Sequence, residues 1–135
     1  MDYRNKNLRQ EYLKQSVMTA SPCELIVMLY DSCIKNLKLA EICLTENNDL
    51  SGAHTHFRNA QDIIMELINC LDPGVELSAK LLDIYEYLLR TLRDMNIKKD
   101  LTLLPDMLDI LTSIRDTWQQ ISKSSYGFAS EVSAG

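Results

Sequence analysis

Apolar residues recur at intervals of three and four along four successive segments of the chain, and short stretches of turn-forming residues separate the segments. The segments cover residues 22–46, 50–71, 76–95 and 101–123. Such spacing gathers the apolar residues on one face of an α-helix, because a helix completes a turn every 3.6 residues. Four long helices with short connections predict an all-α fold, an antiparallel up-down four-helix bundle with a short extra N-terminal helix or arm.

The connections and the composition both favour helices within one domain. Residues 47–49 read Asn-Asn-Asp and residues 72–74 read Asp-Pro-Gly, and both sequences favour turns. The 135 residues include only 4 Gly and 3 Pro, and 46% are hydrophobic. We therefore expect a single helical-bundle domain over residues 1–123, with residues 1–17 as an N-terminal arm and residues 124–135 as a disordered tail.

The first long segment begins with a helix-capping signal. Ser21 can accept a hydrogen bond from a free backbone N–H, and Pro22 suits the first position of a helix. Glu24 has the spacing from Ser21 that a capping box requires. This signal predicts where the helix begins, but it indicates no function by itself.

Charge and hydropathy exclude several classes of partner. The formal net charge is −5, whereas a protein that binds nucleic acid needs a basic face for the phosphates. No apolar run reaches the roughly 18 residues that a membrane span needs, and the first residues lack the apolar core of a signal peptide. We expect no nucleic-acid partner, no membrane insertion and a location in the cytoplasm.

The residues that commonly bind metals or carry catalysis are not arranged for either task. The four cysteines form no Cys-x-x-Cys pair, which favours reduced packing residues. His54 and His56 point in different directions from a helix, and neither follows a Glu at the spacing of dimetal bundles. No phosphate-binding loop or nucleophile elbow occurs. We predict that the protein is not an enzyme, with no catalytic residue, no metal site and no cofactor.

The third and fourth segments carry more apolar residues than one core-facing stripe requires. The main stripe of the third segment is Leu77, Leu81, Ile84, Leu88, Leu92 and Met95, and beside it lie Leu82, Tyr85 and Leu89. The fourth segment has two adjacent stripes, Leu101, Leu104, Leu108, Leu111 and Trp118, and Leu103, Met107, Ile110, Ile114 and Ile121. Either the bundle buries both stripes or one forms a groove for a partner, and periodicity alone favours burial.

Four ordered blocks, preceded by Tyr12, form a pattern that covers nearly the whole chain. They are 19–31, with Thr-Ala-Ser-Pro-x-Glu-Leu and Met-Leu-Tyr-Asp, 60–67, with Ala-Gln-Asp-Ile-Ile-x-Glu-Leu, 96–100, with Asn-Ile-Lys-Lys-Asp, and 115–118, with Arg-Asp-Thr-Trp. This pattern resembles the FliS family, the flagellin-specific export chaperones of bacterial flagella.

The resemblance implies a chaperone that holds the C-terminal segment of flagellin, prevents premature polymerisation and keeps flagellin competent for flagellar type III secretion. A largely extended and helical client segment would then lie on the surplus apolar surface, with charges such as Arg93, Lys98 and Lys99 at its rim. On this interpretation the client-binding groove consists of Leu82, Tyr85, Leu89, Leu103, Met107, Ile110 and Ile114.

The N-terminal arm has two interpretations. The resemblance implies that the segment around Tyr12 covers the groove in the free chaperone and is displaced by flagellin, which makes Tyr12, Leu13 and Val17 an N-terminal cap. Alternatively, Tyr12 is a hydrophobic staple outside the first long helix. The Tyr12→Ala variant separates them, because a large loss of folding stability with unchanged affinity for a flagellin peptide excludes the cap.

A function of a different class stays open on the sequence evidence. The chain could be a self-associating structural helical-bundle module whose copies pair through the same apolar stripes. That alternative predicts a tight homodimer indifferent to flagellin, whereas the chaperone predicts a one-to-one complex with flagellin. The resemblance also implies further partners, namely export-gate or regulatory proteins.

Overall fold

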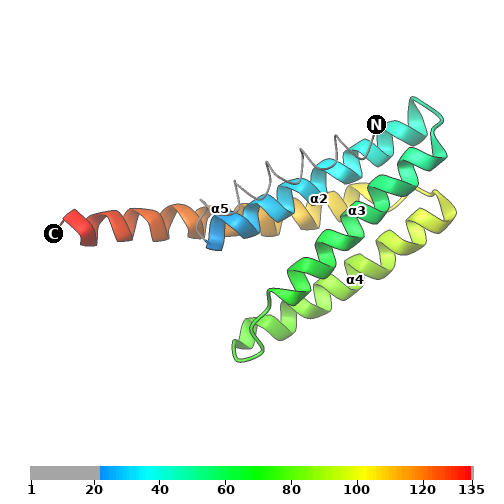
Figure 1. The fold of residues 1–135 in the computed structure, drawn as a ribbon. Helices are drawn as coiled ribbons and strands as arrows, with labels where there is room; N and C mark the ends of the chain where they lie inside the picture. Colours follow the sequence, from blue (N-terminus) through cyan, green and yellow to red (C-terminus); the bar gives the residue numbers. More distant parts are fainter. Residues whose placement is uncertain (1–21, 135) are drawn as a thin grey trace, which may run out of the picture.

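The computed structural model describes residues 22–134, with side chains described for residues 22–123. Four helices form this part of the chain (Figure 1): α2 (Pro22–Thr45), α3 (Leu50–Asn69), α4 (Glu76–Lys98) and α5 (Leu104–Ala134). No strand occurs among these residues. The predicted all-α four-helix bundle is therefore confirmed. Ser21, the predicted cap of the first helix, lies outside the described residues.

The α2–α3 connection ends in a side-chain cap. Asp49 accepts a hydrogen bond from the backbone N–H of Gly52 at 2.9 Å, which satisfies one free donor at the start of α3. A Cβ atom at Gly52 would lie 2.2 Å from Asp49 Oδ2 and 3.0 Å from the sulfur of Cys43. The close approach of Asp49 and α2 therefore explains why a glycine is found in the first turn of this helix.

The α4–α5 connection begins where Lys99 adopts a left-handed conformation, with φ 52° and ψ 41°, directly after Lys98. Asp100 then accepts hydrogen bonds from the backbone N–H and the hydroxyl of Thr102, at 2.9 and 2.6 Å. Helix α5 starts at Leu104, so Pro105 lies in its first turn, where a missing N–H does no harm. The third helix thus ends later, and the fourth starts later, than the apolar pattern predicts.

Helix α5 is also longer than the sequence pattern predicts. Its backbone remains helical to Ala134, whereas the apolar repeat ends near Lys123 and predicts a tail beyond it. In Figure 1 the C-terminal end of α5 projects past the other helices. The stretch 124–134 contains no proline, and its one glycine, Gly127, lowers helix propensity without removing a backbone N–H.

Helix α2 packs against both α3 and α5, and α3 in turn packs against α4. Asn36 of α2 lies beside Asn59, and Cys33 lies beside Ala60, so α2 and α3 run in opposite directions. Figure 1 shows α2 and α5 side by side, while the α3–α4 hairpin diverges from them toward its turn. This divergence leaves α4 without extensive packing against α5.

The core is formed by apolar side chains from all four helices. Its largest fully buried members are Tyr30, Leu37, Phe57, Ile64, Leu67, Tyr85, Leu88, Leu92, Leu104, Met107 and Leu111. Each fully buried side chain of this size contributes about 1.5–3 kcal/mol to folding. Packing of these side chains, rather than helix propensity, therefore holds the helices together.

One polar cluster lies between α2 and α3. Asn36 is buried, and its amide nitrogen donates to the backbone oxygen of Ser32 at 2.8 Å. Its oxygen accepts from Asn59 at 3.2 Å and lies 3.0 Å from Nδ1 of His56. The cluster satisfies Asn36 inside the bundle, so a polar residue on the apolar face of α2 is tolerated.

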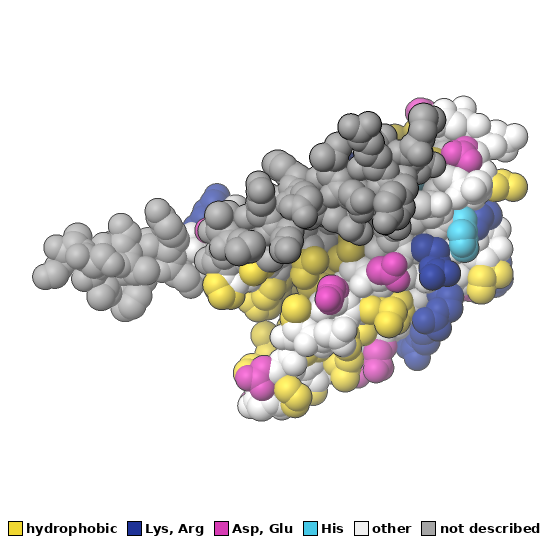
Figure 2. Space-filling model, in the orientation of Figure 1, with side chains coloured by type: hydrophobic (Ala, Val, Ile, Leu, Met, Phe, Trp, Pro, Cys, Tyr) yellow, Lys and Arg dark blue, Asp and Glu magenta, His cyan; other side chains and the backbone are white. Residues whose placement is uncertain are grey.

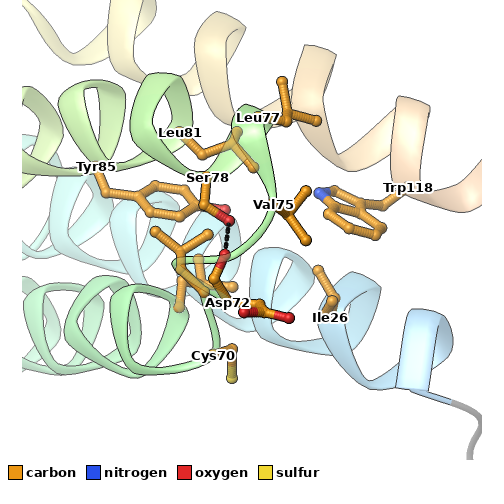
Figure 3. Close-up of a pocket in the computed structure, with 11 residues that line it drawn as sticks. Ile26, Cys70, Asp72, Val75, Leu77, Ser78, Leu81, Tyr85 and Trp118 are labelled. Carbon is orange, nitrogen blue, oxygen red and sulfur yellow. Dashed lines mark hydrogen bonds between the residues drawn. The ribbon is translucent and has the colours of Figure 1, made fainter.

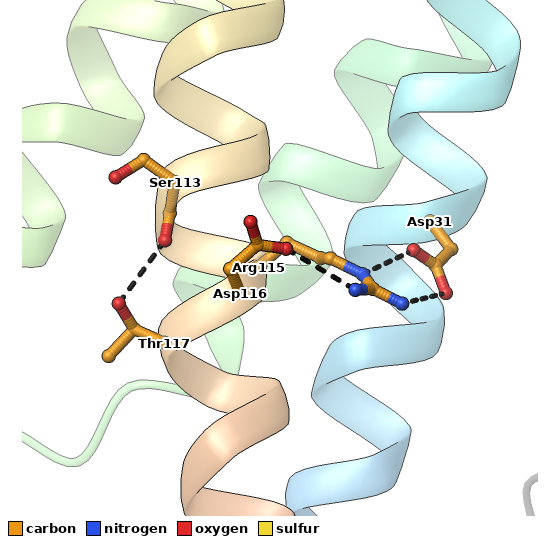
Figure 4. A network of polar contacts seen from close by, with 5 residues as sticks. All are labelled: Asp31, Ser113, Arg115, Asp116 and Thr117. Carbon is orange, nitrogen blue, oxygen red and sulfur yellow. Dashed lines mark hydrogen bonds and ion pairs between the residues drawn. The ribbon is translucent and has the colours of Figure 1, made fainter.

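An ion pair connects α2 and α5 at the surface (Figure 4). Arg115 Nε donates to Asp31 at 2.8 Å, and a second guanidinium nitrogen reaches the same carboxylate at 3.5 Å. Arg115 also contacts Asp116 at 3.3 Å. Because these groups are partly exposed to water, the pair contributes at most about 1 kcal/mol. It orients the helices, while apolar packing stabilises them.

Among the described residues, none of the helices combines the length and apolar character needed to traverse a lipid bilayer.

Candidate binding surface

An apolar pocket of about 190 Å³ opens where the α3–α4 hairpin diverges from α2 and α5. We call it the wedge pocket (Figure 3). All four helices and the α3–α4 turn contribute to it, and the side chains of Trp118 and Ile26 face Val75 across its mouth. The pocket is lined by Ile26, Leu67, Cys70, Leu71, Asp72, Val75, Leu77, Ser78, Leu81, Tyr85 and Trp118.

The α3–α4 turn forms one wall of the wedge pocket and is ordered by its own hydrogen bonds. The carboxylate of Asp72 accepts from the backbone N–H of Gly74 at 2.9 Å, and its backbone oxygen accepts from Val75 N–H at 3.0 Å. The hydroxyl of Ser78 donates to the same backbone oxygen at 2.6 Å. The polar groups of the turn are thus bonded to one another, which leaves apolar side chains to face the opening.

Two of those apolar side chains are strongly exposed. Val75 is 50% exposed and Leu77 is 56% exposed, although both lie at the mouth of a pocket. On the other side of the turn a second groove, of about 310 Å³, is lined by Ile68, Leu71, Pro73, Ser78, Ala79 and Leu82. We call it the turn groove. It shares Leu71 and Ser78 with the wedge pocket, and through Leu71 the apolar surface continues around the hairpin tip.

The inner end of the wedge pocket is a pair of tyrosines. The Tyr85 side chain lines the pocket, and its hydroxyl hydrogen-bonds to that of Tyr30 inside the core. The two ring centroids are 6.4 Å apart and the rings are inclined by 46°. Burial raises the pKa of both phenols above the ordinary value, so both stay neutral. The inner end of the pocket is therefore uncharged.

The residues predicted for the client-binding groove fall into different environments. Leu82 lines the turn groove and Leu103 is exposed, while Leu89, Ile110 and Ile114 are partly buried. Among the cavities described here, the turn groove includes Leu82 and the wedge pocket includes Tyr85, and the predicted client-binding set as a whole stays a prediction. Tyr12, Leu13 and Val17, the predicted N-terminal cap, lie outside the described residues, so that interpretation stays a prediction.

That Tyr85 and Met107 contact a client stays a prediction, although neither side chain is exposed in this structure. Both side chains are buried in the core, Met107 completely. The buried seam of α5 is Leu104, Met107 and Leu111, which takes members from both predicted stripes. The reason is geometric. The boundary between the two stripes is the part of α5 that faces the other helices, so each stripe has some residues that point into the core and others that point away from it.

Leu77, a member of the predicted core-facing stripe of the third segment, lies at the exposed hairpin tip. Ile26 and Val75, which complete the mouth of the wedge pocket, were not predicted at all. One signal was available. Val75 and Leu77 follow a predicted Asp-Pro-Gly turn directly, and a bundle core covers the tip of a hairpin less completely than its middle.

The surface is suited to binding rather than to chemistry. Apart from Asp72 and Ser78, the side chains that line the wedge pocket are apolar, aromatic or a thiol. Within the part of the chain that the structure describes, no group of three or more His, Cys, Asp or Glu residues could hold a metal ion. An open apolar pocket of this kind accepts side chains of a partner.

Fold and surface together define an all-helical bundle with an open apolar pocket at one hairpin tip. The sequence matches the family described as flagellar protein FliS over residues 4–125. The flagellar secretion chaperone FliS of Bacillus subtilis is 39% identical over 113 residues, 84% of each chain. The corresponding chaperone of Salmonella typhimurium is 30% identical over 120 residues, 87% of this chain and 88% of the relative. The chain therefore belongs to the FliS family.

Proposed function

We propose that this protein is a cytoplasmic export chaperone that binds the C-terminal segment of flagellin. It prevents premature polymerisation and keeps flagellin competent for flagellar type III secretion. Membership of the FliS family supports this function, since the matched relatives are named flagellar secretion chaperones. A secretion chaperone needs a client protein and no catalytic machinery, so the protein acts by binding alone.

The observation that carries the proposal is the exposed apolar surface formed by the wedge pocket and the turn groove. Val75 and Leu77 are exposed apolar side chains beside an open apolar pocket, although the core nearby is well packed. Each leucine-sized side chain that a client buries there contributes up to about 1.5–3 kcal/mol. A client segment that becomes ordered on binding loses entropy, which offsets part of this energy and keeps the complex releasable.

The decisive experiment is co-expression with full-length flagellin and with flagellin that lacks its C-terminal segment. We expect a one-to-one complex with the full-length protein, detected as mass in solution by light scattering, and none with the truncated protein. Equal binding of both forms contradicts the proposed client segment. A tight homodimer that flagellin does not alter instead supports the self-associating structural module. Export-gate or regulatory partners would be sought with the complex, not with the free chaperone.

A further inference from the structure

A third cavity, also a groove, lies between α3 and α4, away from the hairpin tip. Its volume is about 390 Å³, and its lining includes His54, Arg58, Gln61, Met65, Arg93 and Ile97. We call it the arginine groove. It shares no lining residue with the wedge pocket or the turn groove. Residues 58, 61 and 65 follow one face of α3, and residues 93 and 97 follow one face of α4.

Gln61 is the unusual member of this lining. Its side chain is only 8% exposed, and its Nε2 atom is buried without a hydrogen-bond partner among the described residues. Buried polar groups in folded proteins are almost always hydrogen-bonded, because an unpaired one loses its water without replacement. Because Gln61 lines the open groove, a rotation of its side chain brings this donor to an acceptor that a ligand supplies.

The groove also contains cations without partners. Within the described residues, neither Arg58 nor Arg93 has an ion pair, and Asp62 is the only acidic residue of the lining. Figure 2 shows Lys and Arg side chains gathered over α4 with a His beside them. Two free arginines in one groove are unexpected in a chain of net charge −5. Their guanidinium N–H groups can donate hydrogen bonds to a carboxylate.

A chain of hydrogen bonds orients the imidazole ring of His54, another polar group of the groove. The Lys99 ammonium donates to the side-chain oxygen of Asn96 at 2.6 Å, which leaves the amide nitrogen of Asn96 to donate to Nδ1 of His54 at 3.1 Å. His54 therefore carries its ring proton on Nε2, where the imidazole can act as a further donor. The polar side of the groove thus consists mainly of donors.

The groove is flanked by exposed apolar side chains. Ile97 is 75% exposed and Met65 is 50% exposed, and Leu89 contributes a partly buried apolar wall. A free phosphate or a nucleic-acid backbone would leave these side chains in water, and the lining offers no aromatic ring on which a base could stack. A peptide with apolar side chains on both sides of an acidic one would cover them.

We propose that the arginine groove binds a segment of a partner protein that presents a carboxylate between apolar side chains. Arg58 and Arg93 hold the carboxylate, and Gln61 Nε2 donates to an oxygen of the bound segment. Met65, Leu89 and Ile97 cover the apolar side chains next to the carboxylate. The groove shares no lining residue with the wedge pocket or the turn groove, the surface proposed above for flagellin.

The test uses two short probes, the peptide acetyl-Ala-Leu-Glu-Leu-Ala-amide and the same peptide with Gln in place of Glu. Binding to the full-length protein is followed by NMR, including the side-chain resonances of Gln61 and the arginines. We expect saturable shifts at Gln61 and Arg93, and about tenfold weaker binding of the Gln peptide, since it lacks the charge. Equal affinities, or shifts confined to the wedge pocket, overturn the proposal.

Two variants and a control separate binding from folding. Arg93→Gln removes the preference for the Glu peptide, whereas Arg90→Gln, on an exposed residue of α4 outside the groove, leaves it unchanged. Gln61→Met weakens peptide binding but raises the melting temperature by about 3 °C, because an unpaired buried amide disappears. A lower melting temperature for Gln61→Met, or unchanged peptide affinity, contradicts the assigned role of Gln61.

The same protein is titrated with a single-stranded oligonucleotide. We expect it to bind more weakly than the Glu peptide, in keeping with the net charge of −5. Tighter binding of the oligonucleotide overturns the proposal in favour of a general anion site. None of these measurements involves flagellin, so failure here leaves the proposed chaperone function untouched, and the reverse also holds.

Discussion

The hydroxyl groups of Tyr30 and Tyr85 hydrogen-bond to each other inside the bundle and connect α2 with α4. These two helices do not pack extensively against each other, because α2 packs against α3 and α3 packs against α4. The tyrosine pair is therefore a direct link between the α2–α5 pair and the α3–α4 hairpin. It also forms the inner end of the wedge pocket, so core packing and the candidate binding surface meet at Tyr85.

The first prediction concerns this link. Tyr85→Phe deprives the buried Tyr30 hydroxyl of the Tyr85 oxygen and lowers the free energy of unfolding by about 1–2 kcal/mol. The double variant Tyr30→Phe/Tyr85→Phe loses less than the sum of the two single variants, because no hydroxyl is left buried without its partner. Urea unfolding curves measure all three. Strictly additive losses would show that the two hydroxyls do not depend on each other.

The second prediction concerns alkaline pH. Burial raises the pKa of Tyr30 and Tyr85 above 10.0 and that of Cys33 from 9.0 to about 12. The folded protein therefore holds these protons more tightly than the unfolded chain. This stability is fully present below the unfolded-state pKa values of 9.0 for Cys33 and 10.0 for the tyrosines. It is lost progressively as the pH rises from there toward the raised folded-state pKa values, by up to about 1.4 kcal/mol per pH unit for each group.

Denaturant unfolding at pH 8, 9, 10 and 11 measures that loss. Tyr85→Phe removes one of the titrating groups, so we expect its stability to fall less steeply above pH 10 than that of the wild type. Equal slopes for the two proteins would contradict the assignment to buried tyrosine.

The third prediction concerns the cysteines. Cys70 is exposed and Cys23 is partly exposed, whereas Cys33 and Cys43 are buried. Only a thiolate reacts rapidly with a maleimide, and burial raises the pKa of Cys33 to about 12. We expect Cys70 to react first, Cys23 next, and Cys33 and Cys43 only after unfolding. Peptide mapping after brief labelling measures this order, and early modification of Cys33 would contradict the packing of α2 against α3.

The fourth prediction uses a matched pair of leucines. Leu77 is 56% exposed in the first turn of α4, at the wedge pocket, and Leu50 is 58% exposed in the first turn of α3, at the other end of the hairpin. Leu77→Glu weakens binding of a flagellin C-terminal peptide about tenfold, which corresponds to about 1.4 kcal/mol, while Leu50→Glu leaves binding unchanged. Both variants change the free energy of unfolding by less than about 0.5 kcal/mol.

Fluorescence provides the measurement for this pair, because Trp118 is the single Trp of the chain and lines the wedge pocket. A peptide that enters the pocket changes the surroundings of this indole. Equal weakening by Leu77→Glu and Leu50→Glu would place the client elsewhere on the molecule.

The local pattern of the sequence predicts the helices well and their exposed faces poorly. The Asp-Pro-Gly turn after α3 and the tolerance of Pro105 in a first helical turn both follow from backbone chemistry, and both are confirmed. The spacing of apolar residues shows that α5 has a wide apolar face, yet it does not show which part faces inward. Met107 is buried and Leu103 is exposed, although they belong to the same predicted stripe.

Contacts between residues that are distant in the sequence decide which part of α5 is buried. The quoted blocks 19–31 and 115–118 meet where Asp31 pairs with Arg115 and where Ile26 faces the same pocket as Trp118. Their sequences identify the family, but their proximity depends on how α5 lies along α2. The wedge pocket likewise needs the α3–α4 turn to stand away from both helices, which no local spacing encodes.

By itself, the sequence determined the helical class, the number of long helices, the turns between them and the family. The helices and turns follow from residue spacing and turn chemistry, which act over a few neighbouring residues, and the family follows from the resemblance of the four ordered blocks. Only the tertiary structure decided that Tyr85 and Met107 are core, that Leu77 is exposed, and that a pocket opens beside Trp118. Those outcomes depend on the angles and rotations at which whole helices pack, and packing joins residues that the sequence keeps far apart.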